Sequence, residues 1–451
     1  MDKVLIRSRH AVTPTGTQPA SIRISGGHIE SVEAYDAPVL GYAAMDYGEI
    51  YILPGLVDTH IHLNEPGRTE WEGFLTGTRA AAAGGYTTVV DMPLNNLPET
   101  TTAENLRVKA DAVKGKAMID YGFWGGVGHD NQAHIEDLAA AGVLGYKCFL
   151  VYPGIEGFTH VSEEQLRAAL PAVARTGLPL LVHAELPGPL EAANPSTDAN
   201  WFAYRTYLDS RPETAEIEAI RMMIRLSREF GVRVHIVHLS AAAALPDLKA
   251  ARAEGLPITV ETCPHYLCFA AEEIPDGATI FKCAPPIRGQ SNQDLLWQAL
   301  LDGDIDLVVT DHSPCPPDMK SRGSGDFSKA WGGIASVQVS LSAMWTMASQ
   351  RGIPIERLVR WMSHRPAALA GIGLRKGSIE SGMDADLVVF DRDCKWTLTA
   401  EQLFTRHAIS PYIGMQLVGK VRETWLRGTR VFESGGFPQP PSGKLCVRWP
   451  P

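Results

Sequence analysis

Two histidines close the apolar run "PGLVDTHIHL", which spans residues 54–63. Successive side chains of a β-strand point to opposite faces, so His60 and His62 share one face and can converge on one point. Imidazole nitrogens at this spacing suit a shared metal ion. The stretch therefore predicts a metal-binding strand end.

Four further residues that can bind a metal lie in or directly after other apolar runs. They are Lys147 in "GYKCFLV", His183 in "LLVHAE", His238 in "IVHLS" and Asp311 in "VVTDHSP". A lone histidine beside a strand is more often hydrogen-bonded packing than a ligand, which is how we interpret His235. Six such groups at strand ends are hard to explain as independent accidents, so we expect one site.

Some of these residues have structural alternatives. Lys147 could pair with a strand carboxylate such as Asp91 or Asp311. An ammonium beside four histidines and divalent cations would be electrostatically unfavourable, however, whereas a carbamate formed with carbon dioxide would bridge two metals. Asp311 could instead be a helix N-cap or an Asx-turn residue. His265 in "CPHY" stays open between a ligand and a packing role.

Eight short β-rich runs alternate with helical stretches between residue 51 and about residue 374. The runs are "YILPGLVDTHIHL", "YTTVVDMPL", "IDYGFWGGV", "LGYKCFLV", "PLLVHAE", "VRVHIVHLS", "PITVETCPH" and "IDLVVTDHS". The stretches between them, such as "SEEQLRAALPAVARTG", begin with acids and often end with glycine, as helices do. The repeat predicts a (β/α)8 TIM barrel over residues 51–375, with the candidate ligands at the C-terminal strand ends.

The two ends of the chain show a different pattern. Residues 1–50 and 376–451 contain short β-rich segments with turns, such as "VLIRSRHAVTP" and "KVRETWLRGTRVFE". We expect these two segments to pair into one small β-sandwich domain beside the barrel.

Composition excludes several classes of function. The net charge is −10, and no Lys/Arg block of the kind that follows a phosphate backbone occurs, so nucleic acid is not an expected partner. No run approaches the roughly 18 apolar residues of a membrane span, and "MDKVLIRSRH" lacks a signal-peptide core. The seven cysteines form no C-x-x-C pair. We therefore expect a cytoplasmic protein with neither a membrane partner nor a disulfide framework.

The motifs "PGLVDTHIHL", "GYKCFL", "LLVHAE", "IVHLS" and "VVTDHSP", in this order, resemble the cyclic amidohydrolase family. The likeness extends to "GMDADLVVFD" and covers essentially the whole chain. It implies a metal-dependent hydrolase that opens ring amides with two divalent cations, zinc first and cobalt, iron or manganese as alternatives. It also implies a homotetramer. The ligands it implies are His60, His62, carboxylated Lys147 and Asp311 for one metal, and the same carbamate, His183 and His238 for the second.

The resemblance also implies a mechanism. A hydroxide shared by the two metals attacks the ring carbonyl, whose oxygen a metal polarises. Asp311 then carries the proton to the departing ring nitrogen, because an amide anion is a poor leaving group. The product is a ureido acid.

Asn64 narrows the expected substrate class. Dihydroorotases carry arginine at this position, in "HLREPG", where it clamps the substrate carboxylate. The neutral amide of Asn64 cannot form that charge-assisted bond, so we expect the substrate to be a neutral ring. Alternatively, Asn64 caps or turns a surface loop. The other substrate contacts we expect, partly through backbone groups near glycines, are Asn95, Cys283, Ala284, Trp331, Gly332 and Gly333.

Six further stretches resemble one subgroup of the family, which acts on such a neutral ring, much more than they resemble hydantoinases. They are "NEPGRTEWEGFLTGTRAAAAGGYTT", "DMPLNNLP", "CPHYLCF", "KCAPPIR", "TDHSPCPPDMK" and "KAWGGIASVQ". Two alternatives remain open. One is a hydantoinase or dihydropyrimidinase, and the other is a non-catalytic assembly protein of the same fold, against which the retention of all six ligands argues.

Overall fold

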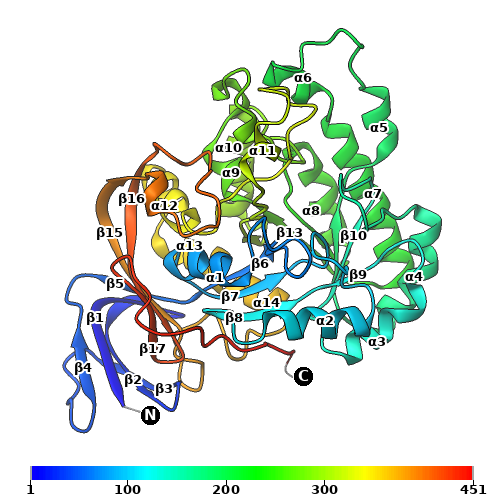
Figure 1. The fold of residues 1–451 in the computed structure, drawn as a ribbon. Helices are drawn as coiled ribbons and strands as arrows, with labels where there is room; N and C mark the ends of the chain where they lie inside the picture. Colours follow the sequence, from blue (N-terminus) through cyan, green and yellow to red (C-terminus); the bar gives the residue numbers. More distant parts are fainter. Residues whose placement is uncertain (1–2, 449–451) are drawn as a thin grey trace.

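The structure, a computed structural model, describes residues 3–448. Figure 1 shows two parts: strands from both ends of the chain form a layer on the left, and alternating strands and helices fill the centre and right. The observed class is α/β with parallel sheets, as the sequence predicted.

The parallel strands form two hydrogen-bonded sheets, and every strand in them falls within one of the eight predicted runs. The three-stranded sheet has the order β6 (Leu56–Ile61), β7 (Tyr86–Asp91), β8 (Asp120–Phe123). The six-stranded sheet runs β14 (Leu307–Val308), β13 (Ile258–Thr262), β12 (Val234–Ile236), β11 (Leu180–His183), β10 (Tyr146–Phe149), β9 (Gly125–Gly126).

Hydrogen bonds also connect the two sheets at both ends. Trp124 alone separates β8 from β9, and its backbone N–H donates to Asp91 over 3.1 Å. At the other end, an isolated parallel bridge joins Ile61 to His312. Beside that bridge, the Thr310 hydroxyl donates to the Asp58 carboxylate over 2.5 Å, which ties β6 to the segment after β14.

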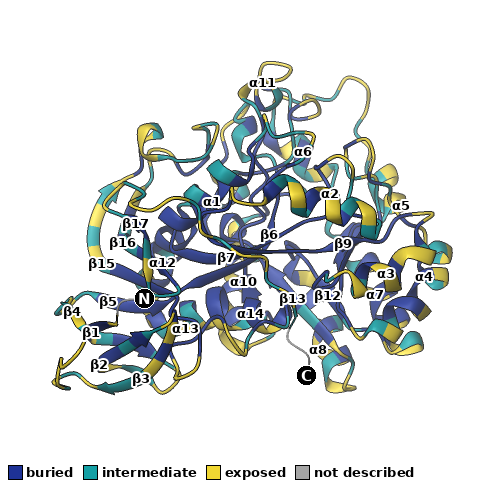
Figure 2. Cartoon of the chain, turned by 60° about the horizontal axis from the view of Figure 1, so that its bottom comes forward, coloured by how far each residue is buried: buried dark blue, intermediate teal, exposed yellow. Residues whose placement is uncertain are grey.

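Helices lie outside these strands, and Figure 2 shows that the central strands are buried while the helices have exposed outer faces. Their ends follow the predicted chemistry: Ser162 forms a capping box with Gln165, and Gly177 ends that helix at φ 65°. The helices are α1 (Phe74–Ala83), α2 (Ala103–Val113), α3 (Ile135–Ala140), α4 (Glu163–Thr176), α5 (Pro187–Ala192), α6 (Tyr204–Asp209), α7 (Glu213–Phe230), α8 (Leu245–Ala253), α9 (Pro264–Cys268), α10 (Gln290–Asp302), α11 (Pro317–Lys320), α12 (Ser340–Gln350), α13 (Ile355–Val359) and α14 (Arg365–Leu369).

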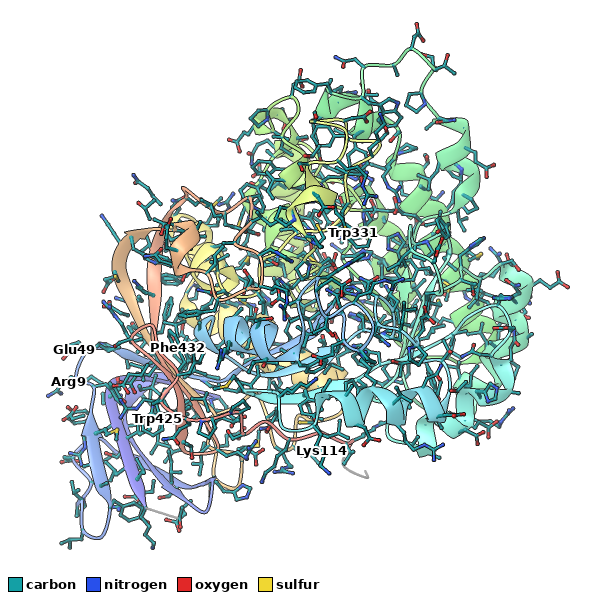
Figure 3. All side chains as sticks on the ribbon, viewed as in Figure 1. Arg9, Glu49, Lys114, Trp331, Trp425 and Phe432 are labelled. Carbon is teal, nitrogen blue, oxygen red and sulfur yellow. The ribbon has the colours of Figure 1, made fainter. Side chains whose placement is uncertain are left out.

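Strands from the two ends of the chain form one mixed sheet. Its order is β17 (Thr429–Glu433), β16 (Gln416–Leu426), β15 (Leu387–Thr397), β5 (Tyr51–Pro54), β1 (Val4–Thr13), β2 (Gly16–Ser25), β3 (His28–Ala34), with β4 (Ala43–Asp46) paired to β1. Trp425 and Phe432, labelled in Figure 3, belong to this layer, far from Trp331.

One predicted strand is divided in the structure. The run "YILPGLVDTHIHL" splits at Gly55 into β5, which pairs with β1 and β15, and β6, which pairs with β7. A Cβ at Gly55 would lie 2.1 Å from the Thr87 hydroxyl, so only glycine lets the chain pass between the two sheets here. β5 lies after residue 50 but hydrogen-bonds with strands from the two ends of the chain. The predicted domain boundary at residue 50 therefore stays a prediction.

Two other properties bear on the predictions. All seven cysteines are free, and five of them are buried. Across residues 3–448, no helix combines the length and apolar character that crossing a membrane requires.

Candidate active site

His60 and His62 lie at the C-terminal end of β6 and face the same carboxylate, as their spacing predicts. The Nε2 atoms of His60 and His62 lie 3.2 Å and 3.6 Å from Oδ1 of Asp311. All three side chains are buried. The two imidazoles and the carboxylate therefore converge on one point.

His183 and His238 extend this cluster from the neighbouring strands. His183 ends β11, and His238 follows β12 by two residues. Nδ1 of His183 lies 3.0 Å from Nε2 of His238, and the ring centroids of His60 and His238 are 5.3 Å apart. Burial lowers the pKa of His62, His183 and His238, which favours the neutral imidazole that binds metals.

Lys147, in β10, is fully buried and its Nζ has no hydrogen-bond partner among residues 3–448. Nζ lies 4.5 Å from the centroid of the Phe149 ring. Burial lowers the pKa of Lys147 to about 8. A pair with Asp91, one sequence alternative, is wrong because Asp91 is 2.5 Å from Nζ of Lys109. A buried amine without a hydrogen-bond partner, part of which is neutral because its pKa is lowered, is available for another chemical role.

Asp311 follows β14 by three residues and has an unusual backbone. The Asx-turn alternative is wrong, because the backbone N–H of Ser313 donates to the carbonyl of Ile334 over 3.0 Å. The Ser313 hydroxyl donates to Oδ1 of Asp311 over 3.1 Å, and the same oxygen faces the two histidines. Burial alone would raise the pKa of Asp311, whereas the neighbouring histidines hold it well below its usual range.

Positive backbone φ angles mark the candidate site. Among the described residues, seven that are not glycine have positive φ, and four of those are predicted site residues: Asn64 (62°), Asn95 (68°), His238 (40°) and Asp311 (44°). Such conformations cost energy and persist where the surroundings enforce them, which is common at active sites.

Two buried glutamates orient the histidines, and sequence reasoning missed both. Glu261, in β13, accepts from Nδ1 of His60 and, over 2.8 Å, from Nε2 of His235. Glu185 lies 2.7 Å from Nε2 of His183 and pairs with Arg211. These bonds leave Nε2 of His60 and Nδ1 of His183 directed at the cluster. Glu185 lies two residues after His183, a spacing that puts both side chains on the same face of an extended strand. That spacing was the signal in the sequence from which Glu185 could have been found.

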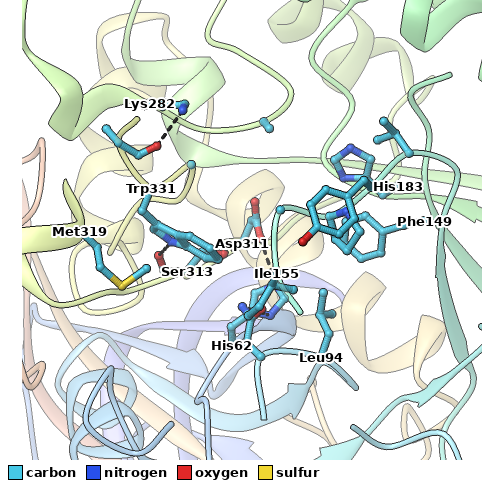
Figure 4. A pocket seen from close by; sticks show the side chains of 18 of the residues that line it. His62, Leu94, Phe149, Ile155, His183, Lys282, Asp311, Ser313, Met319 and Trp331 are labelled. Carbon is cyan, nitrogen blue, oxygen red and sulfur yellow. Dashed lines mark hydrogen bonds and ion pairs between the residues drawn. The ribbon is translucent and has the colours of Figure 1, made fainter. Parts of the chain in front are cut away.

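A cavity of about 620 Å³ opens over the cluster (Figure 4). Several predicted site residues line it: His60, His62, Asn95, His183, His238, Ala284, Asp311, Trp331 and Gly332. Sequence reasoning missed other residues that line the cavity, including Arg68, Trp71, Tyr207, Arg211 and Lys282. Nδ2 of Asn95 also lies 3.2 Å from Nδ1 of His62.

Four predicted residues lie behind the cavity wall. Lys147 is buried and close enough to His183 and His238 for its charge to lower their pKa. Asn64 is buried with neither amide atom hydrogen-bonded in the described part of the chain. The backbone carbonyl of Cys283 accepts from the Tyr207 hydroxyl over 2.6 Å. A Cβ at Gly333 would lie 2.6 Å from that of Ser313, so this position needs glycine. Their contact with substrate stays a prediction.

The donor set fits divalent cations. His60, His238 and Asp311 each offer one atom within 4.8 Å of the others, and His62 and His183 adjoin them. Imidazole and carboxylate ligands suit zinc and related metals. His265, left open by the sequence, is buried outside the cavity lining.

Comparison with known proteins places this geometry in a family. The chain matches the amidohydrolase family over residues 51–431. It is 49% identical to an allantoinase from Streptomyces avermitilis, covering 99% of both chains. It is 42% identical to an allantoinase from Arabidopsis thaliana over 98% of this chain and 91% of the relative. It is 46% identical to an allantoinase from Saccharomyces cerevisiae over 88% of this chain and 86% of the relative.

Solved structures with the same fold include hydantoinases. An L-hydantoinase (dihydropyrimidinase) from Arthrobacter aurescens superposes with a TM-score of 0.94 at 29% identity, covering 99% of this chain and 100% of the other. A dihydropyrimidinase from Brevibacillus agri gives 0.90 at 30% identity, with coverage of 99% and 98%. The subgroup that "KCAPPIR" and the five other stretches resemble is the allantoinases. Relatives that match over nearly the full length of the chain confirm this resemblance. The chain therefore belongs to the metal-dependent amidohydrolase family, and within it to the allantoinases.

Proposed function

We propose that the protein hydrolyses the ring of allantoin to give allantoate, a step of purine catabolism. The observation that carries this proposal is the convergence of four imidazoles, Asp311 and the orphaned amine of Lys147 beneath one cavity. Allantoinase relatives at 42–49% identity support the choice of substrate. Allantoin is a neutral ring, which agrees with the neutral amide of Asn64.

The residues fit two divalent cations, zinc first, with cobalt, iron or manganese as alternatives. His60, His62 and Asp311 would hold one, and His183 and His238 the other. The unpartnered Nζ of Lys147 supports the proposal that this residue, as a carbamate, would be a ligand of both cations, since the pKa near 8 leaves part of the amine neutral and reactive toward carbon dioxide. When bound, such cations activate water and polarise a carbonyl oxygen.

The side chains of the protein supply orientation and proton transfer. Glu261 and Glu185 fix the imidazoles so that the ligating nitrogens face the cavity floor. The Asp311 carboxylate accepts a proton from the attacking water and delivers it to the ring nitrogen as the C–N bond breaks. Asn64, Asn95, Cys283, Ala284, Trp331, Gly332 and Gly333 remain the proposed substrate contacts.

Several structural features are also proposals. We propose that the two parallel sheets form one closed (β/α)8 barrel. Two observations support this: only Trp124 separates β8 from β9, with its N–H bonded to the carbonyl of Asp91, and a β-bridge joins Ile61 to His312. We also propose that residues 1–50 and 376–451 form a separate β-sandwich domain, that residues 51–375 form the barrel, and that the protein is a cytoplasmic homotetramer. The free cysteines support a reducing compartment.

A substrate panel tests the proposed reaction. Allantoin should be opened with the highest kcat/KM, hydantoin and dihydrouracil less efficiently, and dihydroorotate poorly because Asn64 cannot replace a cationic clamp. Comparable turnover of dihydroorotate would overturn the substrate assignment. Absence of bound metal together with no turnover would instead favour the non-catalytic alternative.

A further inference from the structure

Three stretches that resembled allantoinase sequence each contain a lysine that takes no part in the ligand set. They are "KCAPPIR" with Lys282, "TDHSPCPPDMK" with Lys320 and "KAWGGIASVQ" with Lys329. In the structure they come together. Nζ of Lys320 donates to the carbonyls of Lys282 and Trp331 over 2.7 Å and 2.9 Å. The first and third stretches therefore supply one wall of the cavity, called here the lysine wall (Lys282, Ala284, Ala330, Trp331 and Gly332).

Figure 4 shows Lys282 and Trp331 on one side of the cavity and His183 and Phe149 on the other, with Asp311 between them. The backbone of Lys282 is fixed, because its carbonyl also accepts from the N–H of Gly333 over 3.0 Å. The lysine wall is thus a rigid surface that faces the candidate catalytic groups, which is where the part of a substrate remote from the reacting bond would lie.

Lys282 is a cation on this wall, and its ammonium group has N–H donors that the described residues do not use. Nζ donates to the carbonyl of Ala330 over 2.7 Å, and it lies 5.2 Å from the centroid of the Tyr207 ring. No carboxylate in residues 3–448 lies within ion-pair distance of it. An ammonium has three N–H groups, so two remain after the Ala330 bond. Burial and, next, the charge of Arg211 lower the pKa of Lys282 to about 8.

Two other cations of the cavity, Arg211 and Lys329, already pair with carboxylates. Arg211 directs Nε and Nη2 to Glu185, over 3.1 Å and 2.5 Å. Lys329 lies 3.3 Å from Asp326, and its side chain is 62% exposed at the rim. Keeping a half-buried lysine without a carboxylate costs free energy, so a role in binding explains Lys282 better than packing does.

The chemistry of the substrate supplies a matching acceptor. Allantoin consists of a hydantoin ring with a ureido group on the carbon next to the hydrolysed carbonyl, and the ureido oxygen is a strong neutral acceptor. Resting on the proposed function, we propose that Lys282 is a specificity-determining residue whose Nζ donates a hydrogen bond to the ureido oxygen of allantoin. Plain hydantoin has no such group and would not use Lys282.

Substitution with methionine tests this assignment, because methionine keeps most of the apolar stem and removes the donor. For Lys282→Met, kcat/KM for allantoin should fall about 10- to 100-fold, as expected for a hydrogen bond to a charged group. The inhibition constant of hydantoin, measured against allantoin hydrolysis, should change less than about twofold. Lys282→Arg, which keeps a cationic donor, should retain more allantoin activity than the methionine variant.

Lys329→Met is the matched control, since it removes a lysine from the rim of the same cavity, and it should leave both constants near the parent values. Metal content and the thermal midpoint report whether each variant is folded. Equal losses for allantoin and hydantoin would show that Lys282 merely supports the wall and would overturn the proposal. So would an unchanged allantoin kcat/KM. If the metal-loaded parent itself does not open allantoin, the proposed function fails instead.

Discussion

Replacing Glu261 by glutamine tests whether the candidate ligands are oriented from behind. Glu261 accepts from Nδ1 of His60 and from Nε2 of His235, so its carboxylate serves two donors at once. Burial alone would raise the pKa of Glu261, but contact with the two histidines lowers it to about 2. It is therefore ionised at neutral pH. Glutamine has the same shape but one acceptor oxygen, so one histidine must change its tautomer or lose its bond.

The size of the effect follows from these contacts. If the amide oxygen turns to His60, His235 can receive the amide N–H and donate through Nδ1 to the Thr259 hydroxyl, 2.7 Å away. The hydrogen bond from Nδ1 of His60 to residue 261 then remains, but its acceptor is a neutral amide in place of a carboxylate. Bonds to charged groups contribute about 1.5–3 kcal/mol and neutral bonds about 0.5–1.5, a difference of about 1–1.5 kcal/mol. Metal affinity should therefore fall roughly 5- to 13-fold.

The assay is a competition titration of metal-free protein with zinc and a chromophoric chelator, which gives the ratio of metal dissociation constants. Asp120→Asn is the matched control, because Asp120 is a buried carboxylate at the opposite end of the strands, 2.6 Å from Nζ of Lys376. The control should lower the thermal midpoint without changing metal affinity. An unchanged dissociation constant for Glu261→Gln, or an equal change in the control, would refute the orienting role of Glu261.

Three further predictions concern other buried groups. Lys147→Ala should lose metal and activity together, and acetate or propionate should restore both partly while methylamine does not; two retained metals with near-parent turnover would exclude the carbamate bridge. Asp311→Asn should lower kcat by a factor on the order of 10² or more, and activity within a few-fold of the parent would remove Asp311 from proton transfer. Lys320, whose pKa burial lowers to about 7, binds fewer protons folded than unfolded between about pH 7 and 10, so its contribution to unfolding free energy should rise with pH there. Urea titrations should show that Lys320→Met weakens this rise, and an equal slope in both proteins would show that Lys320 stays charged when folded.

Much of the site could be predicted because strand geometry is local. The two-residue period places His60 and His62 on one face of β6, and the parallel repeat brings His183 to the same end of its sheet. No long-range information was needed for that. Lys147 was recognisable as unusual because a lysine inside an apolar run must find a partner or lose its charge.

Other features depend on contacts between distant segments and left no local signal. Glu261 is separated from His60 by about 200 residues of chain, and only the folded sheet brings them together. The passage at Gly55 likewise depends on Thr87 and on pairing with β15, so the apolar run looked like one continuous strand. The lysine wall could not be predicted because its carbonyl acceptors belong to loops without a periodic pattern.

The backbone at the strand ends shows how distant contacts hold the ligands. His238 and Asp311 lie beyond their strands at φ 40° and 44°, a region that costs a non-glycine residue of order 1–3 kcal/mol. The neighbouring carboxylates offset this cost: Glu261 accepts from the N–H of His238 over 3.3 Å, and Asp58 accepts from the N–H of Thr310 over 3.4 Å. Both acceptors are themselves bonded to His60, one through its ring and one through its backbone. The ligands from β6, β12 and β14 are therefore coupled, and a change at Glu261 or Asp58 should disturb all three.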